Sequence, residues 1–306
     1  SQVGGPADAK IVEGVVQETD IVSGKVLFEW HSLEHVPVTE SFRPALTSAG
    51  NSDYFHLNSI AVDLDGNLLV SARHTSTVYK LDRKTGDIIW RLGGLKSDFT
   101  MGPGATFNFQ HDARSHADGS LTLFDNGATD LATGDVEPHS RPLRLHLDTT
   151  AKTATLVHDY QSATPRLAIA TGNLQQLPDD GVVVDWGTIG AITEFAADGS
   201  IVFDANLGDG TFSYRAFRLD WTGNPTTKPS VAIDGTTALV SWNGATEVAY
   251  WQLLTGANAT SLVAKETVAR QSFETAIPLP SGSGYVAVAA LDAKKRRLGV
   301  SAAVRA

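Results

Sequence analysis

Short β-rich runs, punctuated by Asp-Gly turns, recur along this chain in groups of four. The first group spans His56–Gly93, the second Gln110–Tyr160 and the third Gly172–Leu207, so that a group begins about every 50 to 65 residues. Long amphipathic helix patterns are nearly absent. Repeated four-stranded units are typical of β-propeller blades, which stand around a central channel. The pattern therefore predicts an all-β fold that contains part of a propeller ring.

The innermost strand of each blade begins at one mouth of the channel, so residues there are candidates for a site. Counting eight residues back from the three turn glycines reaches Asn58, His111 and Asn173. His56 lies two residues before Asn58, and we expect it on the same side of its strand. The repeat thus predicts a ring of imidazole and amide groups around one rim.

Two side chains on the returning strands are expected at the same rim. Pairing across the turns sets Arg73 roughly opposite Asn58 and Asn126 roughly opposite His111, and a slip of one residue would move a side chain to the other face. An arginine grips sulfate, phosphate or carboxylate at two points, and a histidine near neutral pH serves as nucleophile, general base or general acid. Such a ring, with few carboxylates, suits an anionic ligand. Packing or surface positions are expected for the remaining histidines: His31, His35, His74, His116, His139, His146 and His158.

Composition excludes several classes of function. The formal net charge is -10, which argues against nucleic acid and anionic membrane surfaces as partners. No apolar run reaches the 18 or so residues of a membrane span. Cysteine is absent, which excludes disulfides, zinc-thiolate sites and cysteine nucleophiles. We predict a secreted protein whose signal peptide is not on this chain. No cofactor is predicted, and a structural calcium ion stays open, although no aspartate spacing resembles a known loop.

Several short sequence motifs, which occur in a fixed order and are called words here, resemble those of a known family. They are "GKVLFEWHSLEHVPVTES" (24–41), "DYFHLNSI" (53–60), "SARHTSTVYKLDRKTGDIIWRLGG" (71–94), "FNFQHDAR" (107–114), "LFDNGA" (123–128) and "SYRAFRLDWTG" (213–223). At these words the sequence resembles the arylsulfotransferase family, in its shorter actinobacterial and fungal branch. The resemblance implies a six-bladed propeller that moves a sulfuryl group between phenols through a sulfated histidine, without a nucleotide sulfate donor.

The resemblance also implies roles for individual residues. The histidine that becomes sulfated corresponds to His111, and two further catalytic positions correspond to His56 and Arg73. A weaker match places a Ser-Arg pair at Ser140 and Arg141, and Arg141 is taken as substrate-binding. The family has another active-site histidine in an upstream word that this chain lacks. We therefore expect an N-terminal fragment of the same precursor to complete the ring and supply it.

The last eighty or so residues follow a different sequence pattern. Seven or so short alternating strands, with a tryptophan in the second, resemble a fibronectin type III or immunoglobulin-like β-sandwich. We predict a propeller over residues 1–223, incomplete at its N-terminal side, a linker over 224–230 and a sandwich over 231–306. The alternative for the last segment is a further propeller blade.

The leading functional prediction is sulfuryl transfer from an aryl sulfate, with His111 as nucleophile and with Arg73, His56 and Asn58 holding the sulfuryl oxygens. One alternative is a polysaccharide lyase or another glycan-acting propeller enzyme that uses the same histidines and arginine with Tyr54 or Tyr214. The other alternative is a secreted propeller that binds without catalysis. The predicted substrate is an anionic small molecule or glycan, and the substrate-binding candidates are Asn58, Asn126, Asn173, Arg141 and Tyr54.

Overall fold

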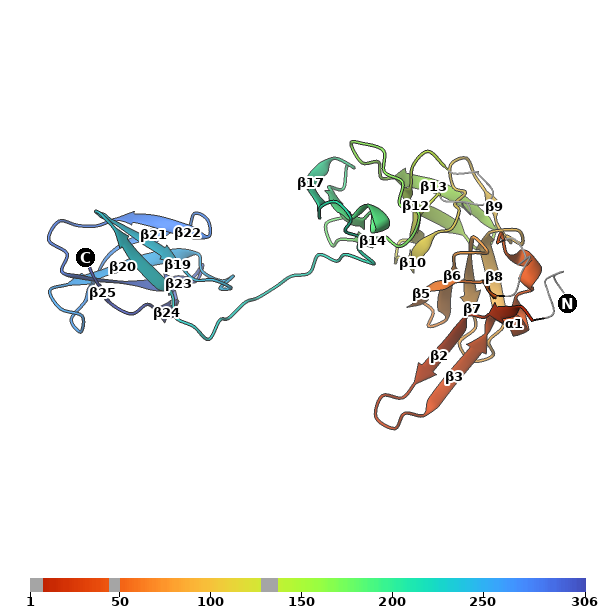
Figure 1. Cartoon of the computed structure of the whole chain (residues 1–306), viewed down its shortest axis with the longest axis horizontal. Helices are drawn as coiled ribbons and strands as arrows, with labels where there is room; N and C mark the ends of the chain where they lie inside the picture. The colour runs from red at the N-terminus through yellow and green to blue at the C-terminus, as the bar shows by residue number, and fades with distance from the viewer. Residues whose placement is uncertain (1–7, 44–49, 128–136) are drawn as a thin grey trace. The chain divides into compact units, whose positions relative to one another are not determined.

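The computed structural model describes residues 8–43, 50–127 and 137–306, which are mostly β-strand. The chain divides into two compact units, Ser1–Arg218 and Leu219–Ala306 (Figure 1). This division lies before residue 223, where the sequence places the end of the first domain. Among the described residues, no helix is long and apolar enough to cross a membrane.

Each of the three repeats found in the sequence forms one antiparallel sheet whose main strands follow chain order. The first sheet contains β5 (Leu57–Val62), β6 (Leu68–Ala72), β7 (Thr77–Leu81) and β8 (Ile88–Gly93). The second contains β10 (His111–Ser115), β11 (Ser120–Asp125), β12 (Arg141–Asp148) and β13 (Thr153–Asp159), with the short β9 (Thr100–Met101) parallel to β13. The third contains β14 (Asn173–Gln176), β15 (Val182–Asp185), the 3-10 turn η2 (Gly187–Ile189), β16 (Ala191–Phe195) and β17 (Ile201–Asn206).

Tight turns explain why these runs fold back on themselves. Gly66 and Gly119 have φ angles of 85° and 82°, a left-handed conformation that glycine adopts without steric cost. In the third hairpin Asp180, with φ of 64°, takes the left-handed position instead of Gly181. Aspartate tolerates this conformation better than most side chains, so the third turn forms without its glycine in that role.

The sheets of the first unit bury their apolar faces against one another in series. Leu69 and Leu92 of the first sheet share a core cluster with Leu123 and Leu143 of the second. Phe124 of the second sheet packs with buried residues of the third, including Trp186. Since every sheet covers one face of its neighbour, the starts of β5, β10 and β14 are held near one another.

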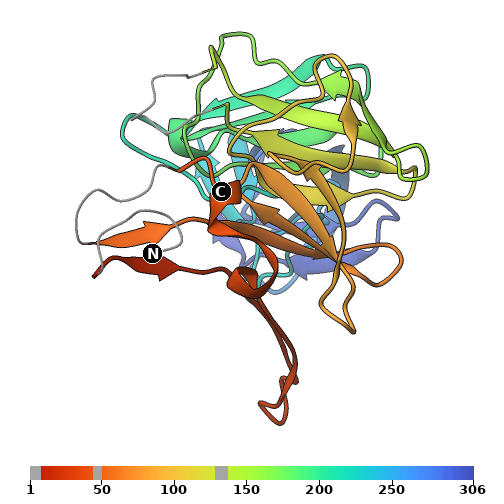
Figure 2. The ribbon, with the colours of Figure 1, turned by 90° about the vertical axis from the view of Figure 1, so that its right-hand side faces the viewer.

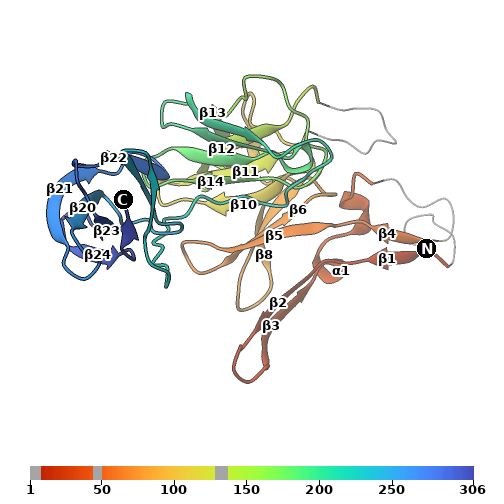
Figure 3. The same cartoon turned by 60° about the vertical axis from the view of Figure 1, so that its left-hand side comes forward.

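The two ends of this series are covered differently. At the beginning, β2 (Val15–Thr19) and β3 (Val26–His31) form a hairpin that projects from the other sheets of its unit (Figure 2). Beside it, β1 (Lys10–Val12) pairs in parallel with β4 (Asn51–Asp53), as Figure 3 shows, and the short α1 (Ser32–His35) and η1 (Val38–Glu40) follow β3. At the other end, large parts of Ile201, Val202 and Phe203 on β17 are exposed to solvent.

The second unit consists of two antiparallel sheets that share a core. One sheet contains β18 (Ser230–Asp234), β19 (Thr237–Ser241) and β22 (Glu274–Pro278). The other contains β20 (Tyr250–Gly256), β21 (Val263–Ala269), β23 (Tyr285–Leu291), β24 (Arg297–Val300) and β25 (Val304–Arg305). Val240 and Ile277 of the first sheet belong to the same buried cluster as Trp251 and Val288 of the second. The fibronectin-like assignment of this unit stays a prediction.

The all-β class is confirmed for the described residues. Over residues 8–43, 50–127 and 137–306, none of the sheets closes on itself and the sheets do not complete a ring. The six-bladed propeller therefore also stays a prediction, to which the three successive four-stranded sheets correspond.

Candidate active site

His111 stands at the first position of β10, on an unusual stretch of backbone. Phe109 and Asp112 on either side have φ angles of 55° and 54°, and the pairing with β11 shifts between His111 and Arg114. Non-glycine residues in this region carry strain of about 1–3 kcal/mol each, which persists only where the surroundings fix them. The buried side chain of Gln110 helps to fix this stretch, because its Nε2 donates to the main-chain oxygens of Ala72 and Thr77 and to a serine hydroxyl on β6.

Hydrogen bonds determine which nitrogen of His111 carries the proton. Asn126 Nδ2 donates to the carbonyls of Ala168 and Thr171 at 2.7 and 3.0 Å. The remaining amide oxygen, Oδ1, therefore accepts from His111 Nδ1 at 2.6 Å. Nε2 is therefore unprotonated, and its lone pair accepts a hydrogen bond of 3.3 Å from the N–H of Thr171.

The surroundings of His111 keep the ring neutral. The side chain is 4% exposed. Burial lowers its pKa to about 3, with the nearby positive charges of Arg73, His56 and Arg215 acting in the same direction and the hydrogen bond to Asn126 acting against it. At neutral pH the residue is thus an uncharged imidazole with an unprotonated Nε2, which is the state that a histidine nucleophile requires.

Arg73 follows β6 and is fixed by groups from three segments. Its backbone N–H donates to the carbonyl of His56 at 3.0 Å. Its guanidinium donates from Nη1 to His74 Nε2 at 2.9 Å and from Nη2 to the carbonyl of Ile169 at 2.8 Å. The guanidinium also lies over the ring of Phe109, 4.7 Å from the centroid, a geometry favourable for a cation. A rigid positive charge therefore stands beside His111.

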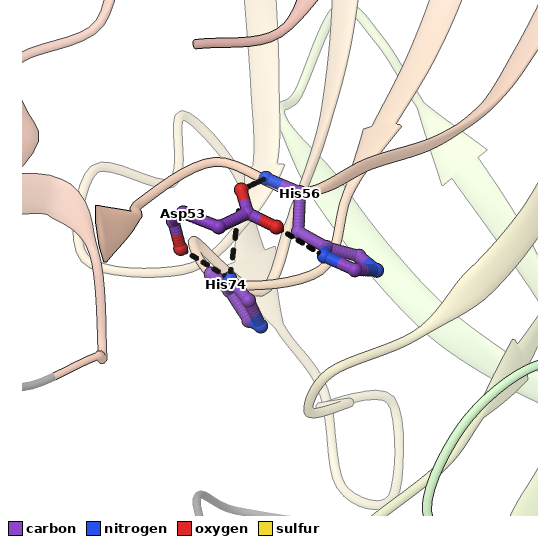
Figure 4. A group of neighbouring side chains, drawn as sticks. All are labelled: Asp53, His56 and His74. Atoms are coloured by element: carbon purple, nitrogen blue, oxygen red, sulfur yellow. Dashed lines mark hydrogen bonds and ion pairs between the residues drawn. The ribbon is translucent and has the colours of Figure 1, made fainter. Parts of the chain in front are cut away.

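Asp53, His56 and His74 form a second group beside this arginine (Figure 4). Asp53 accepts two hydrogen bonds from His56, from the backbone N–H to Oδ1 at 2.9 Å and from Nδ1 to Oδ2 at 2.5 Å. His74 Nδ1 donates to the carbonyl of Asp53 at 2.6 Å, and the two imidazole rings lie 4.6 Å apart. Burial, opposed by the carbonyl of Asp53, lowers the pKa of His74 to about 4.

These three side chains are also the group that could hold a metal ion, since one ligand atom from each lies within 4.8 Å of the others. The hydrogen bonds of His74 do not fit that role. If Nδ1 bound a cation, the ring proton would have to sit on Nε2, where it would face the N–H of Arg73. The chemistry of the trio therefore favours a hydrogen-bonded arrangement.

The part of the chain that contains His56, Arg73 and His111 matches a known protein family. The family model described as arylsulfotransferase (ASST) matches residues 1–208, which contain His56, Arg73 and His111. This chain belongs to the arylsulfotransferase family. The match ends before the 213–223 word, so membership rests on the first two thirds of the chain. No curated protein matches the chain significantly.

Solved structures resemble this arylsulfotransferase-family chain only loosely. A protein of unknown function from Bacteroides caccae has 14% identity and a TM-score of 0.36, covering 91% of this chain and 79% of its own. Virginiamycin B lyase from Staphylococcus aureus has 8% identity and a TM-score of 0.37, covering 95% and 77%. The β-propeller domain of Cps50 (Swd1) from Myceliophteria thermophila has 11% identity and a TM-score of 0.35, covering 95% and 80%. At these TM-scores the similarities carry no argument about the site.

The side-chain amides of Asn58 and Asn173 each hydrogen-bond to the main chain of a segment that follows their own sheet. Asn58 Nδ2 donates to the carbonyl of Gln110, and the N–H of Asp112 donates to Asn58 Oδ1, so this amide brackets His111. Asn173 makes the same pair of contacts with both main-chain groups of Ala216. We call these contacts the amide clamps. In this structure both amides serve the protein rather than a substrate.

The register predicted from the turns is wrong in two places, because the inner strands contain irregularities. The pairing of β5 with β6 shifts at Asn58, and Arg73 bonds to His56 instead of standing opposite Asn58. His111 pairs with Phe124 by register, although its side chain reaches Asn126. His56 precedes β5 in a left-handed conformation, with φ of 52°, so the alternation of a regular strand does not place it.

The structure places Arg141 and Tyr54 in supporting positions. The guanidinium of Arg141 bonds to the buried carboxylate of Asp125 at 2.6 Å and to main-chain oxygens of the 104–106 segment. Tyr54 is fully buried, and its hydroxyl is bonded to Ser32 and Val36. Neither geometry supports substrate binding by these residues, and Tyr54 offers no accessible group to a lyase reaction.

Three residues of this arylsulfotransferase-family site escaped the sequence reasoning. His74 was assigned a packing or surface position, and its place after Arg73 in the "SARH" word was the available signal. Asp53, three residues before His56, is a carboxylate in a ring that the sequence predicts to hold few of them. Arg215 reaches the carbonyl of Asn58 at 2.9 Å and lies 3.4 Å from Asp112, and no local pattern indicates this contact.

Acid is expected to destabilise this fold over a window set by the two buried histidines. The folded pKa values of His111 and His74, about 3 and about 4, lie below the ordinary value of 6.5. The unfolded chain therefore takes up protons first, so their contribution is complete above pH 6.5 and is lost as the pH falls toward 4. The loss approaches about 1.4 kcal/mol per pH unit for each histidine.

Urea unfolding at a series of pH values from 7 to 4 measures this slope. Replacing His111 with glutamine removes one of the two groups, so the variant should lose less stability across the window than the parent chain. Equal slopes in the two proteins would show that His111 does not titrate as its burial requires.

Proposed function

We propose that this chain is a sulfuryl transferase that acts through a covalent intermediate on His111. Membership of the arylsulfotransferase family supports a sulfotransferase-like function. The observation that carries the residue assignment is the neutral His111 ring, with the proton on Nδ1 held by Asn126 and the lone pair on Nε2.

In the first half of the proposed reaction, His111 Nε2 attacks the sulfur of an aryl sulfate. The S–N bond forms, the bond from sulfur to the aryl oxygen breaks, and that oxygen leaves with the bonding electrons as a phenolate. Nδ1 keeps its proton and its hydrogen bond to Asn126, which orients the ring throughout. In the second half, the oxygen of an acceptor phenolate attacks the same sulfur, the S–N bond breaks, and His111 returns to its neutral state.

Fixed positive charge supports both steps. Arg73 and Arg215 are close enough to His111 to lower its pKa. Charges that are already in place can stabilise the oxygens of a sulfuryl group during transfer without reorganising at that moment. Asn58 contributes indirectly, because it fixes the backbone on both sides of His111.

A chromogenic aryl sulfate, supplied with and without an acceptor phenol, tests the proposal. Sustained release of the chromophore only with acceptor, together with one added sulfuryl group on a peptide containing His111, is the expected result. Unsaturated sugar products from a uronate glycan would support the lyase alternative instead. Binding without turnover of either substrate would support the non-catalytic alternative.

We further propose that a segment of the same precursor packs on the exposed end of the three-sheet series. The apolar side chains of Ile201, Val202 and Phe203 on β17 support this, since each preceding sheet covers such a face of its neighbour. The segment would also bring the additional histidine of the family. A secreted location is part of this proposal.

Without that segment, we expect this chain to associate with itself as its concentration rises and to turn over poorly. Co-expression with upstream sequence of the precursor should give a defined complex with higher activity. Light scattering and the aryl sulfate assay measure the two properties. A fully active monomer of this chain alone would contradict the proposal.

A further inference from the structure

The carboxylate of Asp53 holds His56 in a conformation that the backbone alone disfavours. His56 is a non-glycine residue with φ of 52°, and both oxygens of Asp53 accept from it, one from the backbone N–H and one from Nδ1. Asp53 is itself placed by β4, which pairs with β1. Since left-handed residues persist only where surrounding contacts fix them, this geometry indicates that the position of the His56 ring matters.

The same contacts determine the proton on the His56 ring. Burial raises the pKa of Asp53, but the hydrogen bond and charge of His56 and the charge of His74 outweigh it, so that the net pKa lies below its ordinary value. An ionised carboxylate only accepts hydrogen bonds. The proton therefore stays on His56 Nδ1, and proton exchange takes place at Nε2, on the side of the ring away from Asp53 (Figure 4).

Of the three histidines in the site, His56 alone is suited to move a proton. His111 is 4% exposed and its neutral form is strongly favoured. His74 is 5% exposed on its side chain, and both of its nitrogens are engaged, Nδ1 by the Asp53 carbonyl and Nε2 by Arg73. The side chain of His56 is 43% exposed, and within the described residues its Nε2 has no hydrogen-bond partner.

We propose that His56 is the acid and base for the phenolic oxygens, and that Asp53 is the positioning residue that fixes its tautomer. This inference rests on the proposed sulfuryl transfer. As the S–O bond of the donor breaks, a proton passes from His56 Nε2 to the aryl oxygen, while Nδ1 keeps its own proton and its bond to Asp53. When the acceptor oxygen attacks sulfur, its proton passes to Nε2 and the bond from sulfur to His111 breaks. The two steps together return every proton.

The proposal names a substrate class. A nitrophenol leaves readily as its anion and needs no proton, whereas a phenol as weakly acidic as tyrosine, with a pKa of about 10, leaves far better when protonated. We therefore infer that the site is built for sulfate esters and acceptors of ordinary, weakly acidic phenols.

The variant Asp53→Asn tests this. The Nδ2 group of an asparagine at this position would donate a hydrogen bond to His56 Nδ1, so the ring proton would move to Nε2. The same reversal of the tautomer follows when asparagine replaces the aspartate of a Ser-His-Asp catalytic triad. The release of phenol from phenyl sulfate in a single turnover should slow by about 10²-fold, within the range of general acid–base effects. The release of nitrophenol from 4-nitrophenyl sulfate should slow by roughly threefold or less, because that step needs little proton transfer.

Two comparisons separate this role from a structural one. The rates with phenyl sulfate and with 4-nitrophenyl sulfate are measured on the same protein. Partial unfolding would lower both rates equally, so it leaves their ratio unchanged. The matched control is Glu29→Gln, which alters another histidine–carboxylate pair, with His31 at 3.1 Å, and should leave the ratio unchanged. His56→Gln should reproduce the altered ratio, and adding Asp53→Asn to it should produce no further change.

The outcomes are distinguishable from failure of the proposed function. If the parent chain, co-expressed with the upstream segment proposed above, transfers from neither donor, sulfuryl transfer itself is wrong. If the parent chain transfers and Asp53→Asn leaves the ratio of the two donor rates unchanged, whether or not the rates themselves fall, the acid–base role of His56 and the positioning role of Asp53 are wrong.

Discussion

Replacing His111 with glutamine is expected to abolish sulfuryl transfer. Glutamine has no nucleophilic nitrogen, and in the proposed reaction no other side chain forms the bond to sulfur. Losing the nucleophile of a covalent mechanism costs a factor of about 10³ or more in kcat, because the neighbouring groups act on an intermediate that can no longer form. The covalent sulfuryl adduct should disappear from the quenched protein together with turnover.

His146→Gln is the matched control for this change. His146 is an exposed residue on β12, and its replacement should leave both the adduct and the rate at the parent level. Mass spectrometry of the quenched reaction and chromophore release provide the two readouts. Full turnover in the His111 variant, or an adduct on another residue, would refute the assignment of the nucleophile.

Arg73→Ala is expected to impair donor binding and the chemical step together. Its guanidinium is fixed by His74, Ile169 and Phe109, so its charge is present both before and during transfer. Removing one preorganised contact to a developing oxyanion costs about 2 to 4 kcal/mol. We therefore expect kcat/KM to fall by a factor of about 30 to 10³, with a higher KM and a lower kcat.

Arg73→Lys separates charge from geometry. Lysine keeps the positive charge but lacks the planar fork that bonds to His74 and Ile169, so most of the loss should remain. Arg218→Ala is the control, since that exposed guanidinium pairs with Glu194 on the surface. Steady-state kinetics with an aryl sulfate provide the comparison. A lysine variant as active as the parent would mean that charge alone matters at this position.

The sheets were predictable because their signal is local. Alternating apolar runs and turn residues lie within a few positions of one another, and three such groups formed three sheets. The count of residues from each turn and the pairing across it led to His111, His56 and Arg73, and the family motifs point to the same three residues. This count assumes unbroken strands, however. The irregularities at Asn58 and at Asp112 depend on contacts between sheets, which no local pattern contains, so the predicted registers failed there.

The remaining members of the site depend on contacts between distant parts of the chain. Arg215 meets Asn58 across more than 150 positions of sequence. Asn126, a predicted substrate-binding residue, hydrogen-bonds to the ring of His111. Tyr54, also predicted to bind substrate, is buried in the core. Residue type and repeat position identify candidates for such a site. Burial and hydrogen-bond partners decide which of them can meet a substrate.

The amide clamps have a consequence for how such a site can change over evolutionary time. Asn58 and Asn173 bind only the main chain of the segments they hold. A mutation of a held side chain therefore leaves its placement intact, provided that the backbone conformation is tolerated. The two clamps present His111 in one held segment and Arg215, beside the clamped Ala216, in the other. Lineages could thus exchange reactive groups, and with them substrates, without first rebuilding the scaffold.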